Sequence, residues 1–349
     1  MSTIGLIVNP GASRDVRRLT SLARTIDANE QANTVGRVLC GLAAGGVETV
    51  LYMAEPSHVV ERARDVLMAT PAAATWATPD LRPVQLGGDG YAHDAAGTTG
   101  AAAEMAANGA ACLVTIGGDG TNRAVVEGWP DAVLVPLPGG TNNAFGTWLD
   151  PAAAGYAAAL YAADPRAHRA DVVTRPRLDV EIRGRRMIAL VDVAIVRGGW
   201  VGAHAIWDPD LLVEAVLARS DPAVPGLAGV AGMVCPLDGG EARGVHLRFA
   251  RGGRSVIAPL GPGQFVPVHI GAWRTFGPGD ILEIPEGREQ GPGPMTLAFD
   301  GEREVTLEPG EAALLRLVVA GPRVLEAATL LRRAAGEGRM VGPGPAGVR

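Results

Sequence analysis

Over residues 1–150, short apolar runs alternate with longer segments whose apolar positions recur at helical spacing. Apolar runs without polar alternation are typical of strands in a parallel sheet, because such a sheet is covered on both faces. We therefore expect strands at 4–8, 47–53, 111–116 and 132–135, and helices at 28–44, 57–68, 95–109, 151–163 and from 121 onward. This alternation predicts βαβ units and a mostly parallel sheet.

Capping residues support two of these boundaries. Gly45 and Gly46 follow the helix at 28–44 as a stop signal, and Ser57 is the candidate N-cap of the next helix.

The pattern changes after residue 163. Asp-Pro at 164–165 and Arg-Pro at 175–176 mark a linker, and β-like stretches separated by glycine and proline follow it. They predict a strand-rich region, with strands at 178–183, 186–196, 245–250, 254–258, 265–270, 281–284, 295–299 and 304–307. Helices are expected at 209–219, with Pro209 in the first turn, and at 322–335, before a disordered tail.

A chain of 349 residues is long enough for two domains of roughly 150 residues each. We expect an α/β nucleotide-binding domain at 1–165 and a β-rich substrate domain at 166–321. Residues 322–349 are expected to form a helix that packs back on the first domain, followed by a flexible tail.

All 31 basic residues are arginines, since the sequence contains no lysine. This excludes a Walker A lysine, a pyridoxal-phosphate Schiff base and a lysine general base. Any bound phosphate must then be held by backbone N–H groups, arginines, hydroxyls or a metal ion. The net charge of −6 argues against a general nucleic-acid-binding protein, which needs a basic face.

No apolar run approaches the roughly 18–20 residues of a membrane span. The start, MSTIGLIVNPGAS, has neither the basic nor the long apolar region of a signal peptide, so we expect a cytoplasmic protein without a membrane span. Cys40, Cys112 and Cys235 form no C-x-x-C pair, so neither a disulfide framework nor a zinc site is predicted. Cys40 and Cys112 lie in apolar runs and are expected in the core.

The strongest candidate for chemistry is Ile116-Gly117-Gly118-Asp119-Gly120-Thr121, between an expected strand and an expected helix. Three glycines let the backbone approach a ligand closely, and the N-terminus of the following helix favours an anion. Thr121 can cap that helix or bind a phosphate. Asp119 is unfavourable beside phosphate unless it binds Mg²⁺, a hydroxyl or a ribose, which makes it a candidate general base or metal ligand.

Two further polar loops follow neighbouring strands, at 9–14 and 136–145. Loops at the carboxyl ends of parallel strands converge on one crevice, so the three loops together predict a site for nucleotide phosphates. Arg14, Arg17, Arg18 and Arg123 are candidates to supply positive charge. The residues expected to bind the nucleotide are Asn9, Pro10, Arg14, Gly117, Gly118, Gly120, Thr121, Asn122, Gly139, Gly140, Thr141, Asn142 and Asn143.

The motifs NPGAS, IGGDGTNRAVVEG and PLPGGTNNAF together resemble the NAD kinase and diacylglycerol kinase superfamily, whose hallmark is GGDGT. The nearer similarity is to ATP-NAD kinase-like proteins of the acetoin-catabolism protein X type, which residues 201–212 and 297–307 also resemble. The resemblance runs from the first strand to about residue 310. It implies a phosphofructokinase-like α/β domain, a β-sandwich-like domain and an active site between them.

The resemblance also implies phosphoryl transfer from ATP to a hydroxyl with Mg²⁺ as cofactor. In NAD kinases the GGDGT aspartate, here Asp119, orients or deprotonates the ribose 2′-hydroxyl. In the lipid kinases the aspartate of a late Asp-Gly-Glu takes the proton, and residues 300–302 match that element. Asp-Gly between two strands is also a common hairpin turn. Asp119 and Asp300 are therefore both candidate catalytic residues, and no metal ligand is assigned.

Departures from the family motifs leave the acceptor open. No GSTAY-like segment of the NAD kinases is found, Asn122 falls one place earlier than in the lipid kinases, and Ala144 replaces an acid. The leading expectation is a kinase of the 2′-hydroxyl of NAD(H), with ATP or polyphosphate as donor. The alternatives are a lipid kinase using Asp300, a kinase of another small hydroxyl compound, and a nucleotide-binding regulator without turnover. The resemblance further implies a homo-oligomer, either a dimer or a tetramer.

Overall fold

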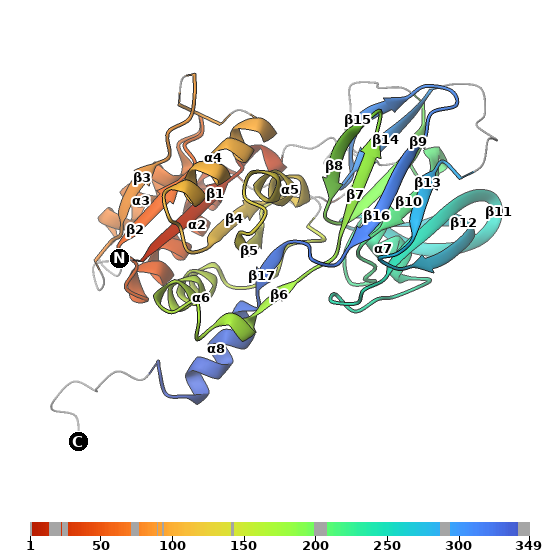
Figure 1. Cartoon of the computed structure of the whole chain (residues 1–349). Coiled ribbons are helices and arrows are strands. Elements are labelled where there is room, and N and C mark those ends of the chain that lie inside the picture. The colour runs from red at the N-terminus through yellow and green to blue at the C-terminus, as the bar shows by residue number, and fades with distance from the viewer. Residues whose placement is uncertain are drawn as a thin grey trace.

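The computed structural model describes residues 2–13, 22, 27–70, 77–88, 90–92, 94–140, 143–198, 208–286 and 294–340. Within them the chain forms an α/β unit followed by a strand-rich unit, which confirms the fold class expected from the sequence (Figure 1).

The α/β unit is built on one seven-stranded sheet with the order β3-β2-β1-β4-β5-β17-β6. Its strands are β1 (Thr3–Val8), β2 (Thr49–Tyr52), β3 (Asp80–Pro83), β4 (Leu113–Gly117), β5 (Val133–Pro138), β6 (Val172–Thr174) and β17 (Arg323–Leu325). All neighbours run parallel except β6, which is antiparallel to β17. The carboxyl ends of β1, β4 and β5 therefore lie next to one another, as the prediction that their three loops converge requires.

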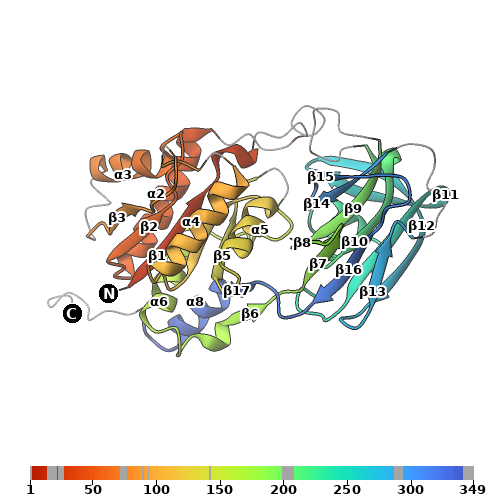
Figure 2. The same ribbon diagram turned by 45° about the horizontal axis from the view of Figure 1, so that its top comes forward.

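Helices cover both faces of this sheet (Figure 2). The helices are α2 (Ala28–Ala44), α3 (Val59–Ala69), α6 (Pro151–Ala163) and α8 (Ala327–Gly336) on one face, and α4 (Ala95–Ala107) and α5 (Asp119–Gly128) on the other. Aspartates cap three of them: Asp27 accepts backbone N–H groups at the start of α2, Asp94 at α4 and Asp150 at α6. Such caps satisfy N–H groups that have no partner within the helix.

The strand-rich unit contains two antiparallel sheets. One has six strands, in the order β12 (Gln264–Phe276), β11 (Gly244–Gly261), β10 (Leu212–Leu217), β9 (Asp192–Arg197), β14 (Met295–Phe299) and β15 (Glu302–Leu307). The other has four, in the order β13 (Ile281–Ile284), β16 (Ala313–Val318), β7 (Arg177–Ile182) and β8 (Arg185–Ala189). Buried side chains from both sheets form one cluster, so the two sheets pack as a sandwich.

The prediction of a helix at 209–219 is wrong. Pro209–Leu211 is a short 3₁₀ turn, and residues 212–217 form the strand β10. β10 lies between β9 and β11 and is almost entirely buried. A run that is apolar on both faces has no alternation, and its periodicity cannot separate a central strand from a buried helix.

Other element boundaries differ in smaller ways. The run 186–196 contains the end of β8 and most of β9, whereas 245–250 and 254–258 belong to one strand, β11. The helix expected at 322–335 begins at Ala327, because residues 323–325 pair with β5 as β17.

Ser57 is not the N-cap of α3. Instead, the carboxylate of Glu55 accepts the backbone N–H groups of Ser57 and Val59 (2.5 and 2.6 Å).

Strands β6 and β17 carry the chain from the first sheet to the sandwich and back. The sheet boundary therefore lies near residue 175, ten residues beyond the division expected after residue 165. Helix α8 packs against α6 of the first unit.

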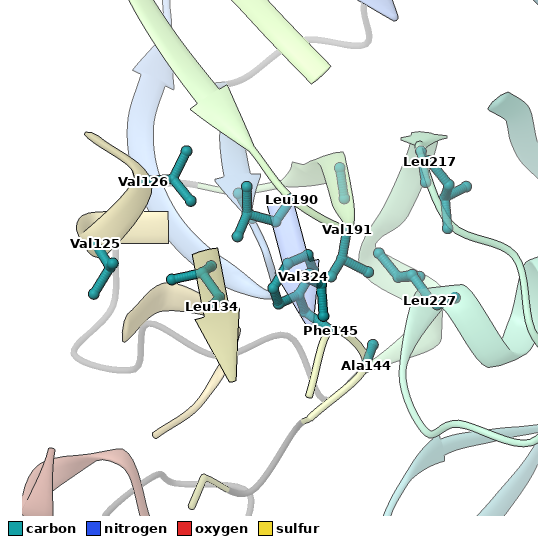
Figure 3. Packing of buried hydrophobic residues seen from close by; sticks show 14 of the residues in the cluster. Val125, Val126, Leu134, Ala144, Phe145, Leu190, Val191, Leu217, Leu227 and Val324 are labelled. Atoms are coloured by element: carbon teal, nitrogen blue, oxygen red, sulfur yellow. The ribbon is translucent and has the colours of Figure 1, made fainter. Parts of the chain in front are cut away.

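One hydrophobic cluster is shared by the two units (Figure 3). It joins Val125 and Val126 of α5 to Leu190 and Val191, which connect β8 to β9. Phe145, only 1% exposed, belongs to the same cluster. The boundary between the units is thus a packed core, and the groups placed at it are held rigidly.

Helices α2 and α6 pack through a glycine on each. A Cβ on Gly41 would lie against the carbonyl oxygen of Ala152, and a Cβ on Gly155 against that of Val38. Because these clashing atoms belong to the backbone, a side chain at either position would force the helices apart.

We predict that Gly41→Ala lowers the free energy of unfolding by about 2 kcal/mol, since overpacking outweighs the gain in helix propensity. Gly36→Ala in the same helix is the matched control, because its Cβ would lie 3.8 Å from the Leu67 side chain in ordinary contact. That control should be neutral or slightly stabilising. Urea unfolding of both variants measures the difference, and equal stabilities would contradict this account of the packing.

Candidate active site

The GGDGT motif forms the junction between β4 and α5. Gly117 ends the strand and Gly118 is the N-cap residue of the helix, so Asp119 lies in the first turn. The helix begins two residues earlier than expected, and Thr121 is not its cap. Gly118 has no side chain with which to cap α5, in contrast to the aspartates at the starts of α2, α4 and α6. A helix start without a side-chain acceptor is the arrangement that binds anions in many proteins.

The three predicted loops contact one another through backbone and side-chain groups. Gly139 donates its N–H to the carbonyl oxygen of Gly117 (2.9 Å), and a Cβ on Gly140 would lie 2.9 Å from the Cα of Gly118. Asn9 donates from Nδ2 to the hydroxyl oxygen of Thr121 (2.9 Å). The loops after β1, β4 and β5 thus meet at one place, as their positions in the sequence predict.

Two of the predicted ligand-binding amides are engaged within the loops. Asn122 accepts the hydroxyl of Thr115 (2.7 Å) and donates to the carbonyl oxygen of Gly118 (3.1 Å). Asn143 accepts the N–H of Gly140 (2.9 Å) and donates to its carbonyl oxygen (2.7 Å). Both side chains therefore fix the shape of the loops.

The remaining predicted residues are distributed as follows. Pro10 begins a short 3₁₀ turn after β1, and Gly120 is in the first turn of α5. Arg14, Arg17, Arg18, Thr141 and Asn142 lie outside the described residues.

Asp119 is buried, with 3% of its surface exposed. Its carboxylate accepts the backbone N–H groups of Ala144 (3.0 Å) and Phe145 (2.9 Å) from the loop after β5. Burial raises the pKa of Asp119 to about 7, and the nearby charge of Asp300 adds to the rise, while the two N–H groups oppose it. A carboxyl group with this pKa can accept a proton near neutral pH.

Asp300 occupies the turn of the hairpin between β14 and β15. Asp300 and Gly301 both have positive φ (50° and 85°), as a tight hairpin turn requires. The turn points the carboxylate inward, where Oδ1 accepts the N–H groups of Leu190 (3.0 Å) and Val191 (2.8 Å). Burial raises the pKa of Asp300, against the opposing effects of Arg123 and these donors.

Arg123 joins the two units. It lies on α5, pairs with Glu304 of β15, and has its Nε 3.9 Å from a carboxylate oxygen of Asp300. Its guanidinium carbon lies 5.7 Å from the centre of the Phe299 ring. The sequence indicated Arg123 only as one of several candidate cations, because its partners are more than 170 positions away along the chain.

Two further arginines near the site were not indicated by any motif. Arg175 donates from Nη1 to the carbonyl oxygen of Phe145 (3.0 Å) and lies over its ring. Arg219, just beyond β10, interacts electrostatically with both Asp119 and Arg175. Burial, reinforced by Arg219, lowers the pKa of Arg175. Neither residue carried a local signal, because only the packing of the two units brings them to Asp119.

Asp119 and Asp300 could supply only some of the ligands that a bound Mg²⁺ ion needs. No group of three or more His, Cys, Asp or Glu that could hold a metal ion occurs in the described part of the chain. Asp119 and Asp300 also use carboxylate lone pairs to accept backbone N–H groups. This donor set suits Mg²⁺ bound mainly through substrate phosphates and water, which is a common mode for that ion.

The outcome for other predictions is mixed. Cys112 is buried, and burial raises its pKa to about 12, which confirms it as an inert core residue. Cys40 is only partly buried. Among the described residues, no helix is both long and apolar enough to cross a membrane.

Comparisons with known proteins agree with the motifs. Residues 4–164 match the ATP-NAD kinase N-terminal domain, a phosphotransferase domain, which confirms the enzyme class expected from the sequence. Residues 176–320 match the acetoin catabolism protein X C-terminal domain.

Acetoin catabolism protein X of Cupriavidus necator is 32% identical over 340 residues, covering 95% of this chain and 92% of that protein. The structure of yeast NADH kinase complexed with NADH shares 11% identity, with a TM-score of 0.47 over 100% of this chain and 91% of that chain. Structural similarity at this low TM-score adds nothing to the assignment of the family. The sequence identity and the two domain matches show that the chain belongs to the acetoin catabolism protein X family, with a first domain of the ATP-NAD kinase type.

Proposed function

We propose that this protein transfers the terminal phosphoryl group of ATP to a hydroxyl of a small molecule, with the 2′-hydroxyl of NAD(H) as the first candidate acceptor. The observation that carries the proposal is the meeting of three glycine-bearing loops beside the buried carboxylate of Asp119. Phosphoryl transfer depends mainly on positioning and on stabilising charge, and such loops supply both.

In this reaction the carboxylates and the backbone N–H groups of the site would have different roles. The acceptor oxygen bonds to the γ-phosphorus, the bond from that phosphorus to the bridging oxygen breaks, and ADP leaves. The proton of the acceptor passes to a carboxylate, for which Asp119 is the leading candidate because its pKa is about 7. Backbone N–H groups of 117–120 would hold the phosphates, since those of Gly139 and Gly140 already donate within the loops. Mg²⁺, when bound with the nucleotide, would neutralise phosphate charge.

Asp300 is the second candidate for the base. Its carboxylate is also buried and close enough to Asp119 to raise the pKa of that residue. If Asp300 accepts the proton, a lipid acceptor such as diacylglycerol becomes the alternative substrate. An ATP-dependent reaction favours a cytoplasmic location. The expected dimer or tetramer also stays a prediction.

The first test is ADP release with Mg-ATP in the presence of NAD, NADH or diacylglycerol, for the wild type, Asp119→Asn and Asp300→Asn. We expect NADP(H) formation that falls at least about a hundredfold in Asp119→Asn, since general-base catalysis contributes about 10²–10⁴-fold. The exposed Asp131→Asn is the matched control. Lipid phosphorylation lost in Asp300→Asn would support the alternative. Bound ATP without ADP release from any acceptor would indicate another hydroxyl compound or a regulator without turnover.

A second test addresses the phosphate-binding loops. Gly140→Ala should weaken ATP binding about tenfold, or about 1.4 kcal/mol, because its Cβ would push the loop after β5 away from Gly118. Gly87→Ala is the control, since no atom of the described residues lies within 4 Å of the added Cβ. Calorimetric titration with ATP compares the two variants. Equal affinities would show that the contact between Gly140 and Gly118 has no part in nucleotide binding.

A third test uses the pKa of Asp119. Because folding raises this pKa from about 3.9 to about 7, the folded protein binds the proton more tightly than the unfolded chain. The resulting stabilisation is complete below pH 4 or so and is lost as the pH rises to about 7, by an amount on the order of 4 kcal/mol.

Urea unfolding at pH 5 and pH 8 measures this loss. Asp119→Asn, which cannot ionise, should lose less stability than the wild type between these two pH values, whatever its absolute stability. The same pH dependence in variant and wild type would mean that Asp119 has an ordinary pKa.

A further inference from the structure

The guanidinium of Arg123 is enclosed between the two units. Only 10% of the side chain is exposed, and each part of it meets a different group of the second unit: Nη2 pairs with Glu304, Nε faces Asp300, and the planar face lies over Phe299. The third nitrogen, Nη1, is buried and has no hydrogen-bond partner among the described residues. A planar group with several donors can satisfy this geometry, whereas a lysine ammonium could meet only part of it.

Burial of such an arginine is costly unless its contacts serve a purpose. Moving a charge out of water costs several kcal/mol, and a buried ion pair often adds no stability over apolar residues of similar size. The cost is compounded here by the unpartnered Nη1. Simple adhesion between the units is already supplied by the apolar cluster around Phe145. An effect of Arg123 on the neighbouring carboxylates of Asp300 and Glu304 therefore explains its burial better than adhesion between the units does.

Acids surround Asp300 on several elements. Asp119 and Glu127 act on it from α5, Glu304 lies on β15 in the same hairpin, and Asp192 is hydrogen-bonded to it through the backbone. Arg123 is the cation whose side chain approaches this carboxylate in the described residues. The guanidinium of Arg123 lowers the pKa of Asp300 and so favours its ionised form.

We propose that Arg123 is a positioning residue for phosphoryl transfer: by bridging α5 to the β14–β15 hairpin, it holds the Asp300 carboxylate charged and close to Asp119. This inference rests on the proposed function for its catalytic consequence. Burial raises the pKa of Asp119 most, and the ionised Asp300 adds to that rise by repelling charge on Asp119. Arg123 thus acts on the base through Asp300.

The two carboxyl groups should respond to the loss of Arg123 in opposite directions. Without the guanidinium, the pKa of Asp300 rises, because the effect of burial is no longer opposed by a positive charge. A protonated Asp300 no longer repels charge on Asp119, so the pKa of Asp119 falls. A residue that merely joined the two units would change stability without this crossed pattern.

The experiment is carboxyl-carbon NMR of the full-length protein labelled at aspartate, titrated from pH 3 to pH 9. Asp119→Asn and Asp300→Asn assign the two resonances. In Arg123→Gln we expect the Asp300 titration to move up by at least one pH unit, a tenfold change in proton affinity, and the Asp119 titration to move down. Glu127→Gln, on the same helix, is the matched control and should move Asp300 slightly down, since it removes a negative charge.

Arg123→Lys keeps the charge without the planar geometry, and we expect a smaller shift in the same direction. It also replaces Arg123→Gln if that variant does not fold. Unchanged titrations of both aspartates in a folded Arg123 variant would overturn the proposal.

Kinetics give the second readout. If ADP release is established, Arg123→Gln should lower kcat about tenfold with little change in the KM for ATP. The acid limb of the pH profile of kcat should move to lower pH, together with the pKa of Asp119. An inactive wild type would contradict the proposed function and leave the NMR result as an independent test of Arg123.

Discussion

The arrangement of this protein depends on the burial of two carboxylates, Asp119 and Asp300, at the boundary between its units. A buried negative charge must be met by donors, and each unit supplies them from nearby backbone. Asp119 takes N–H groups from the loop after β5, and Asp300 takes them from the connection between β8 and β9. Arg123 then links the second carboxylate to α5. The site is consequently part of the core between the units.

That core explains how a site assembled from distant segments keeps its shape. Phe145 packs with Leu190 and Val191 across the boundary (Figure 3). The backbone N–H groups of these same residues donate to Asp119 and Asp300. Close packing restricts the positions of these backbone groups more than a solvent-filled cleft would. The strands β6 and β17 add a second connection, because both belong to the first sheet and lead directly into the sandwich.

The absence of lysine limits which side chains can balance the negative charge of this site. Arginine has to supply all side-chain cations, and Arg123, Arg175 and Arg219 gather near the two acids. Each is held by a specific partner: Glu304 for Arg123, the carbonyl oxygen of Phe145 for Arg175, and Asp221 for Arg219. Since a guanidinium stays charged in almost any environment, the charge at this boundary is set by the acids.

The sequence by itself determined the α/β alternation, the three loops and the motifs that identify the family, because these signals are local: apolar periodicity, glycine and short motifs. It also indicated both acids. The tertiary structure decided that 212–217 is a strand, since a run buried on both faces has no diagnostic period. It also decided that Asn122 and Asn143 shape the loops and that Arg123 reaches Asp300. The two amide contacts are local, but the sequence does not show whether an asparagine bonds to its own loop or to a ligand. The contact of Arg123 depends on which distant groups meet, and charge interactions of that kind leave no pattern along the chain.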